Sequence, residues 1–480
     1  MSINNNTASR GLFINCFIAL VATAFCFILR AFAIDDWGHE FALSETQKGE
    51  LLGVGLWPFA ISIVLLSLVI DRLGFKFMLW LAAICHLTGF AIIMTASGYW
   101  GLYVGTFILS IGNGTVEAAI NPLIATAFRD NKTTWLNRLH AGWPGGLVLG
   151  GLLSLMLGTS VSWRIKMALI VIPVIIYAVM LMGRQFPRSE RVAAGVAYRD
   201  MLAEAGFLSA LIVVALMVLE IGRVFGLPMM LQLIIIAALS GAYAAWSRSI
   251  GRPLFIVMTL VMIPLATTEL GTDSWITSLM EPQMTSLGLQ AGWVLVYTAL
   301  IVLVLRFVAG PLIHRWSPLG LLAISAAVAA IGLVTLSMSS GFALLIAATI
   351  YGLGKSFFWP TSLGVVAEQC PKGGAVTLNV VAGVGMLAAG IVGSVLLGAI
   401  QDHAVSNALR DYDTQHATQL HATLVTQEKR SILGTYLSLD QNKLAASDAA
   451  TQKTVNGAIN ESKRTALHDV AILPVVMLMV

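Results

Sequence analysis

The chain has 480 residues, of which 58% are hydrophobic and only 11% are charged, and its net charge is +4. A water-soluble domain carries about 25% charged residues, so this composition excludes a soluble globule and favours a protein that uses the lipid bilayer as its solvent. No nucleic-acid partner is expected. The four cysteines show no metal-ligand spacing, so no metal site is expected either.

A helix that crosses a bilayer needs about 20 mostly apolar residues. The first part of the chain contains six such runs, at 11–34, 49–70, 77–96, 100–128, 136–158 and 161–182. Two further runs follow a polar stretch, at 207–225 and 229–246. Five more lie at 253–275, 289–312, 319–339, 341–366 and 374–400. A last run begins near residue 470 and is too short to cross.

This order of six, two and six predicts an all-α polytopic membrane protein with about 14 helices, the last of them incomplete. The expected organisation consists of six parts. They are an N-terminal six-helix bundle at 1–182, a cytoplasmic linker at 183–206, an inserted two-helix hairpin at 207–252, the C-terminal bundle at 253–400, a long extracytoplasmic loop at 401–467 and the start of a final helix at 468–480.

The distribution of lysine and arginine in the short loops predicts the orientation, because cytoplasmic loops are enriched in both residues. With the N-terminus in the cytoplasm, fourteen of these residues fall on the cytoplasmic side. Four fall on the other side: Lys48, Arg164, Lys166 and Arg223. The bias predicts a multi-pass protein of the cytoplasmic (inner) membrane, and it fits an even number of inserted helices.

Short similarities in sequence suggest that the two six-helix parts are related. The loop after the second helix contains Asp71 and Arg72, and the loop at the same place in the second part contains His314 and Arg315. A glycine precedes a proline by eight residues in the fourth helix of each part, at Gly114 and Pro122 and at Gly352 and Pro360. Transporters built from two such repeats bind their substrate between them.

Four motifs carry a resemblance to a known family. The loop at 71–76 resembles the major facilitator signature Asp-Arg-x-Gly-x-Lys, with Ser67 in place of the usual preceding glycine. The stretch at 114–122 contains an intramembrane glutamate before Asn-Pro, a Leu-Asn pair begins the next helix at 136–137, and a Phe-Trp-Pro-Thr run occupies 358–361. Together these motifs are similar to the fucose–galactose–proton symporter branch of the major facilitator superfamily.

The resemblance implies two six-helix bundles around a central cavity and a function as a proton-coupled monosaccharide symporter with alternating access. It implies a monomer without cofactors, in which the coupling ion is a proton, with sodium as the alternative. Two departures bear on the substrate. Helix 1 carries Arg30 where known symporters of the branch have a carboxylate, and His140 replaces a sugar-binding glutamine. A sugar acid or another anionic solute is therefore a second reading.

Glu117, Arg30 and Glu269 are the candidates for proton coupling. Glu117 lies in an apolar helix, where a charge costs about 2.5–3.5 kcal/mol by insertion scales. It can load and release a proton, or it can form a purely structural ion pair with Arg30. Glu269 and Asp273 are four residues apart and share a helix face, either as a second titratable site or as an outer gate. Arg306 is expected near the end of its helix in a structural role.

Six residues are assigned to substrate binding: Asn121, His140, Trp143, Lys355, Trp359 and Asn379. Asn121 shares a helix face with Glu117, and Pro122 removes the helix hydrogen bond to the carbonyl of residue 118. For the others, the alternatives are a packed histidine, tryptophans of the membrane interface, and a lysine that reaches the membrane surface.

Two further features concern conformational change. Asp71, Arg72, Lys76 and Arg315 are expected to form a latch at the cytoplasmic ends of the helices. The glycines at 142, 146 and 150 recur every four residues and predict close helix packing, with motion at that contact as an added hypothesis.

The sequence contains no Gly-x4-Gly-Lys-Ser/Thr motif of an ATP-driven pump and no nucleophilic triad, so an enzyme is not expected. The predicted function is secondary active transport of a small polar solute. A membrane sensor that binds its ligand without moving it is the alternative from a different class.

Overall fold

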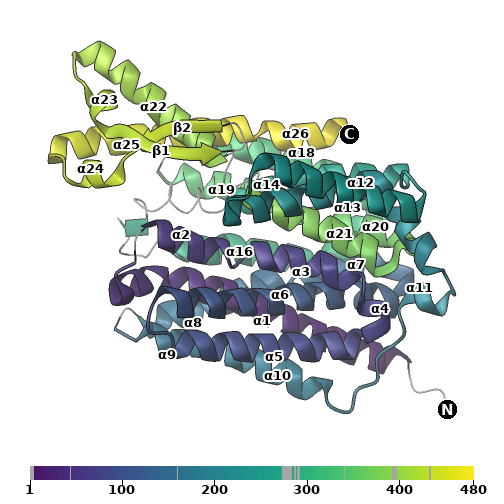
Figure 1. The fold of residues 1–480 in the computed structure, drawn as a ribbon. Coiled ribbons are helices and arrows are strands. Elements are labelled where there is room, and N and C mark those ends of the chain that lie inside the picture. The colour runs from purple at the N-terminus through teal and green to yellow at the C-terminus, as the bar shows by residue number, and fades with distance from the viewer. Residues whose placement is uncertain are drawn as a thin grey trace.

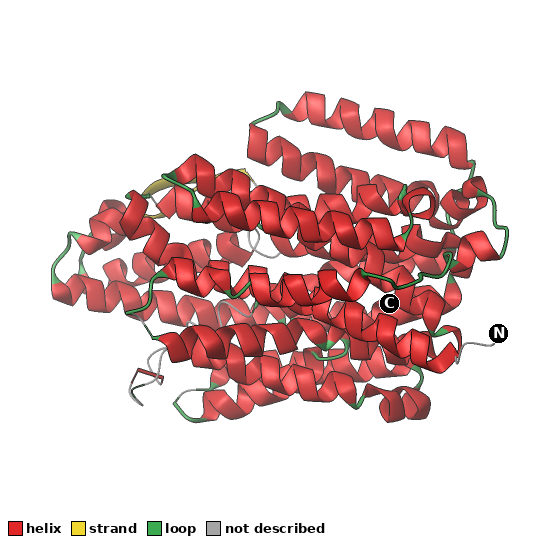
Figure 2. Cartoon of the chain, turned by 90° about the horizontal axis from the view of Figure 1, so that it is seen from below, coloured by secondary structure: helices red, strands yellow, loops and turns green. Residues whose placement is uncertain are grey.

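The computed structural model describes residues 5–43, 45–158, 160–272, 284–285, 288, 292–339, 341–391, 397–431 and 434–480. Long helices lie side by side in a single bundle, and the described chain is almost wholly helical (Figures 1 and 2). Two strands, β1 (Val425–Ser431) and β2 (Gly434–Leu439), form an antiparallel hairpin. The all-α polytopic class is thus confirmed, with this hairpin as its exception.

The first half contains six membrane-crossing units, several of them broken into two helices. It comprises α1 (Asn5–Phe41), α2 (Glu45–Gly53), α3 (Trp57–Ser67), α4 (Ile70–Leu73), α5 (Phe75–Met94), α6 (Tyr99–Ala127), η1 (Arg129–Asn131), α7 (Lys132–His140), α8 (Gly142–Leu157), α9 (Trp163–Ala168) and α10 (Val171–Leu181). The short helix α11 (Glu190–Ala193) follows in the linker.

The second half begins after an inserted hairpin of α12 (Tyr198–Phe225) and α13 (Met229–Ser247). It comprises α14 (Pro253–Gly271), α16 (Gly292–Phe307), α17 (Ala309–Trp316), α18 (Pro318–Met338), α19 (Ala343–Lys355), α20 (Phe358–Gln369), η2 (Pro371–Gly373) and α21 (Gly374–Ala388). The chain continues through α22 (Leu397–His416), α23 (Leu420–Leu424), α24 (Gln441–Ala445), α25 (Ala449–Val470) and α26 (Ile472–Met479).

Eleven helices of the described chain are long and apolar enough to cross a membrane, or twelve if the bent pair α16–α17 is one span. The pair bends by 60° at its break. The span predicted at 341–366 is also broken, into α19 and α20, and neither piece is long enough by itself. These breaks explain why fewer long helices are found than apolar runs.

The two ends of the bundle differ (Figure 1). The N-terminus, α4 and α11 lie at one end, called here the α11 end, whereas α9 and the segment from α22 to α24 lie at the other, called here the α9 end. The halves touch through α3 and α21, α6 and α21, α7 and α20, and α8 and α16. A site between the halves is therefore walled by these helices.

The backbone repeats itself between the halves. Gly74 (φ 82°, ψ 152°) precedes α5, and Ser317 (φ 60°, ψ 161°) precedes α18 at the equivalent place. Phe128 (φ −126°, ψ 58°) leads from α6 into η1, and Cys370 (φ −121°, ψ 53°) leads from α20 into η2. The positive φ of Ser317 is uncommon for a residue other than glycine. These matching conformations support two related halves.

The inserted hairpin lies against both halves. Its first helix, α12, packs on α21 and α14, and α13 packs on α12. The ring of Phe225 on α12 lies 6.1 Å from that of Trp57 on α3. At the α11 end, the hydroxyl of Tyr198 donates to the carbonyl of Leu68, 2.9 Å away. The insertion therefore spans the line where α3 meets α21.

The segment predicted as a long loop at 401–467 is largely folded. Helices α22 and α25 pack on each other, and β1, β2, α23 and α24 complete a small body that projects beyond the bundle (Figure 1). Its apolar core is separate from that of the bundle and includes Leu409, Leu424 and Val455. Helix α25 runs on to Val470, and α26 then packs against α14 and α18.

Candidate functional site

A small cavity of about 40 Å³ lies between the two halves. Both halves contribute charged and aromatic side chains to it. Its lining consists of Phe59, Glu117, His140 and Trp143 from the first half and Glu269, Leu270, Arg306, Trp359 and Met386 from the second. Since transporters with two repeats bind substrate at the repeat interface, this cavity is the candidate site.

Glu117 is the acid that the first half contributes. It is 4% exposed on α6, and its Oε2 accepts a hydrogen bond from Nδ2 of Asn121 at 2.8 Å. Oδ1 of Asn121 lies 2.9 Å from Nε2 of His140, so His140 donates there when its Nε2 carries the proton. In the described part of the chain, Glu117 forms no ion pair. The expected alternative, a structural pair with Arg30, is therefore not present.

Glu269 is the acid that the second half contributes, and it is paired. Nη2 of Arg306 donates to its Oε1 at 2.6 Å, and the backbone N–H of Trp359 donates to its Oε2 at 3.1 Å. Arg306 is 3% exposed and Glu269 is 7% exposed. A buried ion pair of this kind needs further hydrogen bonds to offset the cost of removing both charges from water.

Two backbone carbonyls, each left without a helix donor by a proline, accept those further hydrogen bonds from Arg306. Pro144 and Pro360 lack an N–H, so the carbonyls four residues earlier, of His140 and Ser356, have no helix donor. Arg306 donates to both: Nη1 to the oxygen of His140 at 2.9 Å and Nε to the oxygen of Ser356 at 2.8 Å. One side chain on α16 thereby binds α7, α14 and the break between α19 and α20.

Arg306 lies in the last turn of α16, as expected, but it also lines the central cavity, which the sequence did not indicate. Helix α16 does end at Phe307, but the same span bends there and continues through α17 to Trp316. Arg306 therefore lies at an internal break of this bent pair. Pro144 and Pro360 each leave the carbonyl four residues earlier without a helix donor. This pattern in the sequence could have indicated that a donor side chain lies here.

Arg30 has no such partners. It is 3% exposed, its Nε has no hydrogen-bond partner among the described residues, and the ion pairs found there do not include it. Its guanidinium lies against Gly55, where any side chain would collide with it. Its Cζ is 5.8 Å from the ring of Phe27, which in turn is 5.5 Å from Trp143 of the cavity. Arg30 is thus a buried cation beside the cavity.

The remaining predicted binding residues lie at different distances from the cavity. Trp143 and Trp359 line it. Asn379 is fully buried and donates across the interface to the carbonyl of Ala118 at 2.9 Å. Lys355 is buried with its Nζ 5.3 Å from the ring centre of Tyr351, and it does not reach the lining. Asp273, the proposed neighbour of Glu269, lies outside the described residues.

At the α11 end, the predicted latch contains one strong contact. Oδ2 of Asp71 accepts from Nε of Arg191 at 2.6 Å, and its Oδ1 accepts from Ser189 at 2.6 Å. Lys76 donates to the carbonyl of Arg184 at 3.2 Å. The other two predicted members do not take part: Arg72 and Arg315 are exposed. The partner of Asp71 thus comes from the linker helix α11, which sequence reasoning missed.

Direct contacts between the halves close this same end. The backbone N–H and the hydroxyl of Thr133 both donate to Oε1 of Glu368, at 3.1 and 2.5 Å. Nζ of Lys132 donates to the carbonyl of Ala367 at 3.1 Å and forms an ion pair with Glu190 of α11 at 2.7 Å. Helices α7, α11 and α20 are thereby tied together.

The glycine stripe on α8 packs as predicted, but within one half. A Cβ on Gly146 would lie 2.5 Å from Cβ of Ala24 on α1, and one on Gly150 would lie 2.8 Å from Cγ2 of Ile28. The neighbouring Gly151 instead faces Val296 of the other half. The close α1–α8 contact therefore does not lie between the parts that move in a two-half carrier.

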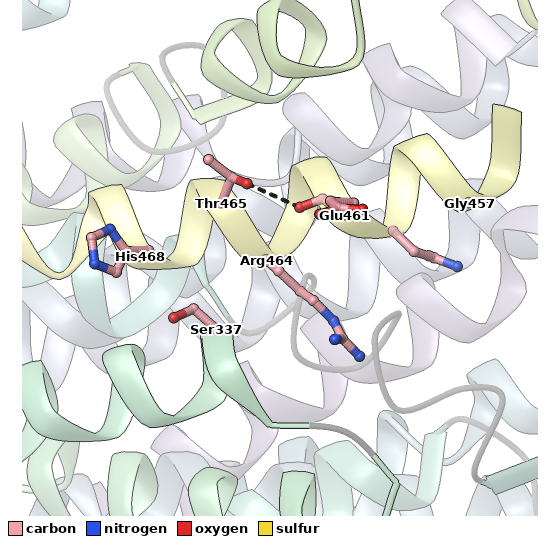
Figure 3. Close-up of a pocket in the computed structure, with 7 residues that line it drawn as sticks. Ser337, Gly457, Glu461, Arg464, Thr465 and His468 are labelled. Carbon is pink, nitrogen blue, oxygen red and sulfur yellow. Dashed lines mark hydrogen bonds between the residues drawn. The ribbon is translucent and has the colours of Figure 1, made fainter. Parts of the chain in front are cut away.

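A wider pocket of about 480 Å³ lies at the α9 end between α18 and α25 (Figure 3). It contains Ser337, Glu461, Arg464 and His468. Glu461, which accepts from Thr465 at 3.2 Å, and His468 are exposed. Every residue that lines this pocket belongs to the second half or the body that follows it, so it is not the site that two halves could enclose in turn.

Two curated relatives match part of the chain. The cis,cis-muconate transport protein of Acinetobacter baylyi is 28% identical over 173 residues, which cover 35% of this chain and 41% of the relative. The hexuronate transporter of Bacillus subtilis is 25% identical over 142 residues, which cover 29% of this chain and 34% of the relative. The chain thus matches less than half the length of each.

Solved structures match along almost the whole chain. The proton:xylose symporter XylE superposes with a TM-score of 0.64 at 14% identity, covering 99% of this chain and 96% of that one. FucP, the fucose:proton symporter of E. coli, superposes with a TM-score of 0.58 at 15% identity, covering 96% and 98%. At these identities the likeness establishes the fold.

The predicted family is confirmed by a match over most of the chain. A model of the Major Facilitator Superfamily matches residues 12–394, which include both halves and the inserted hairpin. Together with the shared fold, this match shows that the chain belongs to the Major Facilitator Superfamily and is a multi-pass membrane transporter rather than an enzyme.

Proposed function

We propose that this transporter moves a small organic anion, a solute with a carboxylate group, together with a proton. The observation that carries this proposal is the state of Arg30, a buried cation without an anionic partner among the described residues. Removing an unpaired ion from water costs several kcal/mol. A substrate carboxylate that approaches Arg30 would offset this cost and could bind the guanidinium through two parallel hydrogen bonds.

The known solutes of the two curated relatives agree with this chemistry. Their names give muconate and hexuronate, and both compounds carry carboxylates. A sugar acid, which was the second reading of the sequence, belongs to the same class. An anionic solute is therefore favoured over the neutral monosaccharide that the sequence predicted first.

Glu117 is the residue that carries the coupled proton in this proposal. It is buried, and its described partner is the neutral amide of Asn121. A buried carboxylate that no cation contacts directly is stabilised by a proton. Glu269 is less suited to this role because Arg306 already neutralises it at 2.6 Å. The proton is the proposed coupling ion, and sodium is the alternative.

Transport requires the halves to move. Ligand pockets for small molecules are about 300–1,000 Å³, whereas the central cavity measures about 40 Å³ and holds only a few water molecules. The α11 end is closed by Thr133, Glu368 and the linker helix. We therefore place substrate release at the α11 end after this contact opens, with that end in the cytoplasm and the protein in the cytoplasmic membrane.

A neutral monosaccharide remains the second candidate, and one observation favours it. Trp143 and Trp359 face the same cavity from opposite halves. Aromatic rings at such a place can stack on the apolar face of a sugar ring when the cavity widens. A sugar acid would use both features, the tryptophans and Arg30.

The test is uptake into proteoliposomes with an inward proton gradient, with sodium, and with neither. Radiolabelled glucuronate and cis,cis-muconate are compared with glucose, the neutral parent of glucuronate. We expect proton-driven accumulation of a carboxylate and not of glucose. Glu117→Gln is expected to abolish the accumulation while exchange of labelled for unlabelled solute continues. If glucose accumulates and neither glucuronate nor muconate does, the anion assignment is overturned.

A further inference from the structure

The inserted hairpin forms one wall of a second small cavity, which lies beside the central one. This lateral cavity has a volume of about 40 Å³ and lies between α3, α12 and α21. Its walls are formed by Leu56 and Trp57 on the first half, Met386 and Leu387 on the second, and Glu220 and Arg223 on the insertion. The two charged residues come from the insertion alone, for which the sequence predicted no role.

Met386 lies in the walls of both cavities. Its side chain is 8% exposed. Methionine is unbranched and flexible, so it can change its shape at low cost.

Helices α3 and α21 are held together on one side of this point. Gly383 lies against Val64, so closely that any side chain at position 383 would collide with the valine. Val64 lies toward the α11 end of α3, whereas Leu56 and Trp57 lie toward its α9 end. The two helices are therefore in tight contact on the α11 side of the lateral cavity, which itself lies toward the α9 end.

The wall of the lateral cavity contains an exposed cation, Arg223. Arg223 donates to Glu220 through Nε at 3.0 Å and Nη2 at 2.6 Å. Glu220 is buried, but the side chain of Arg223 is 51% exposed. A guanidinium has five N–H donors, and Glu220 uses two of them. The exposed remainder can receive a second carboxylate.

We propose that the lateral cavity is the access path from the α9 end to the central site, with Arg223 as a first binding point for the solute's carboxylate and Met386 as the gate. The inserted hairpin then supplies the wall and the charge that select the solute. The carboxylate preference rests on the proposed anion transport, whereas the path itself does not.

The path is tested without any substrate, by labelling single cysteines in intact cells with a charged thiol reagent that cannot cross membranes. Leu387→Cys places a thiol in the lateral cavity, and Val384→Cys, one turn away in the packed core, is its matched control. We expect labelling of L387C at least tenfold faster than that of V384C. Equal rates would overturn the path.

The gate is tested with Leu270→Cys, which places a thiol in the central cavity. Adding Met386→Trp should slow the labelling of L270C at least tenfold and leave the labelling of L387C unchanged. The second measurement shows that the tryptophan has not collapsed the fold or the outer part of the path. Unchanged labelling of L270C would overturn the role of Met386.

The binding point is tested with the double variant Glu220→Gln/Arg223→Gln, which leaves no unpaired buried charge. We expect the KM for glucuronate to rise 3-fold to 10-fold while the maximal rate stays within twofold. An unchanged KM would overturn the role of Arg223. If neither glucuronate nor muconate is transported at all, the proposed function fails, and the two labelling tests still decide whether the path exists.

Discussion

Asn379 of α21 donates its side-chain amide to the carbonyl of Ala118 on α6, 2.9 Å away. This carbonyl is available because Pro122, four residues later, has no N–H to offer it. Ser356 and Pro360 repeat the arrangement in the second half, where Arg306 is the donor. Each proline therefore exposes a carbonyl inside the membrane, and each carbonyl is bound by a side chain from another helix.

The bond between Asn379 and Ala118 joins the two halves, so it stabilises the state in which they are in contact. We expect Asn379→Leu to remove about 1 kcal/mol from this state, which shifts its population about fivefold. Pro122→Ala returns a helix donor to Ala118, and in that background Asn379→Leu should have a smaller effect. The comparison of both single variants with the double variant measures the coupling. Additive effects would contradict the assigned role of Pro122.

Cys370 is a native reporter of opening at the α11 end. It follows the last residue of α20, is buried, and lines a small space beneath Ser189 and Glu190 of the linker. Burial raises the pKa of the Cys370 thiol from 9.0 to about 11. The reactive thiolate is therefore scarce at neutral pH, and labelling should speed up about tenfold per pH unit between pH 7 and 9.

Opening of the α11 end should raise the reactivity of Cys370 further, because a thiol in water has the ordinary, lower pKa and is accessible. The difference between the protein and its Cys370→Ser variant isolates this thiol from Cys85, which is half-buried. A labelling rate that does not change with pH would show that access, rather than deprotonation, limits the reaction.

The Asp71–Arg191 pair is expected to keep the linker helix in place. Both side chains are buried, with exposures of 6% and 8%, and breaking a buried pair by removing one charge costs about 3–5 kcal/mol. Asp71→Asn should release α11 and speed up the labelling of Cys370 at least tenfold. Arg72→Gln and Arg315→Gln change exposed members of the predicted latch and should leave the rate within twofold. A strong effect of either would restore the latch as the sequence predicted it.

The sequence predicted the family, the fold and most of the cavity. Glu117, His140, Trp143, Glu269 and Trp359 all line the central cavity, because a polar or aromatic group within an apolar helix is visible in the sequence.

The pairing of these groups was not predictable in the same way. Arg306, which neutralises Glu269, lies at the break between α16 and α17, and the sequence did not reveal this bend. Arg30 was considered as a possible ion-pair partner of Glu117, yet it lies against Gly55 instead. Spacing along one helix indicates a shared face, but it does not indicate which other helix that face meets.

Gly55 offers a way to move Arg30 without removing its charge. A methyl group at position 55 would collide with the guanidinium, so Gly55→Ala must displace it. We expect the KM for glucuronate to rise at least fivefold, while the affinity for a neutral sugar, if one binds, stays the same. Gly49→Ala is the matched control, since a methyl group there meets no atom within 4 Å. An unchanged KM for glucuronate would contradict the role of Arg30.

The number of unpaired acids predicts how transport responds to voltage. Among the acids that line the central cavity, Glu269 is neutralised by Arg306, and Glu117 alone is left to carry a proton. One proton carried with a monocarboxylate moves no net charge. Each uncompensated charge would gain about 2.3 kcal/mol per 100 mV, so an electroneutral carrier gains nothing from the potential.

Glucuronate uptake should therefore follow an imposed pH gradient and stay constant when a potassium gradient with valinomycin sets the potential at equal pH. Muconate, a dicarboxylate, would carry one net negative charge with a single proton. Its inward movement should slow when the vesicle interior is made negative. Uptake of glucuronate that accelerates with an interior-negative potential would show that more than one proton moves, and it would return Glu269 to the list of proton carriers.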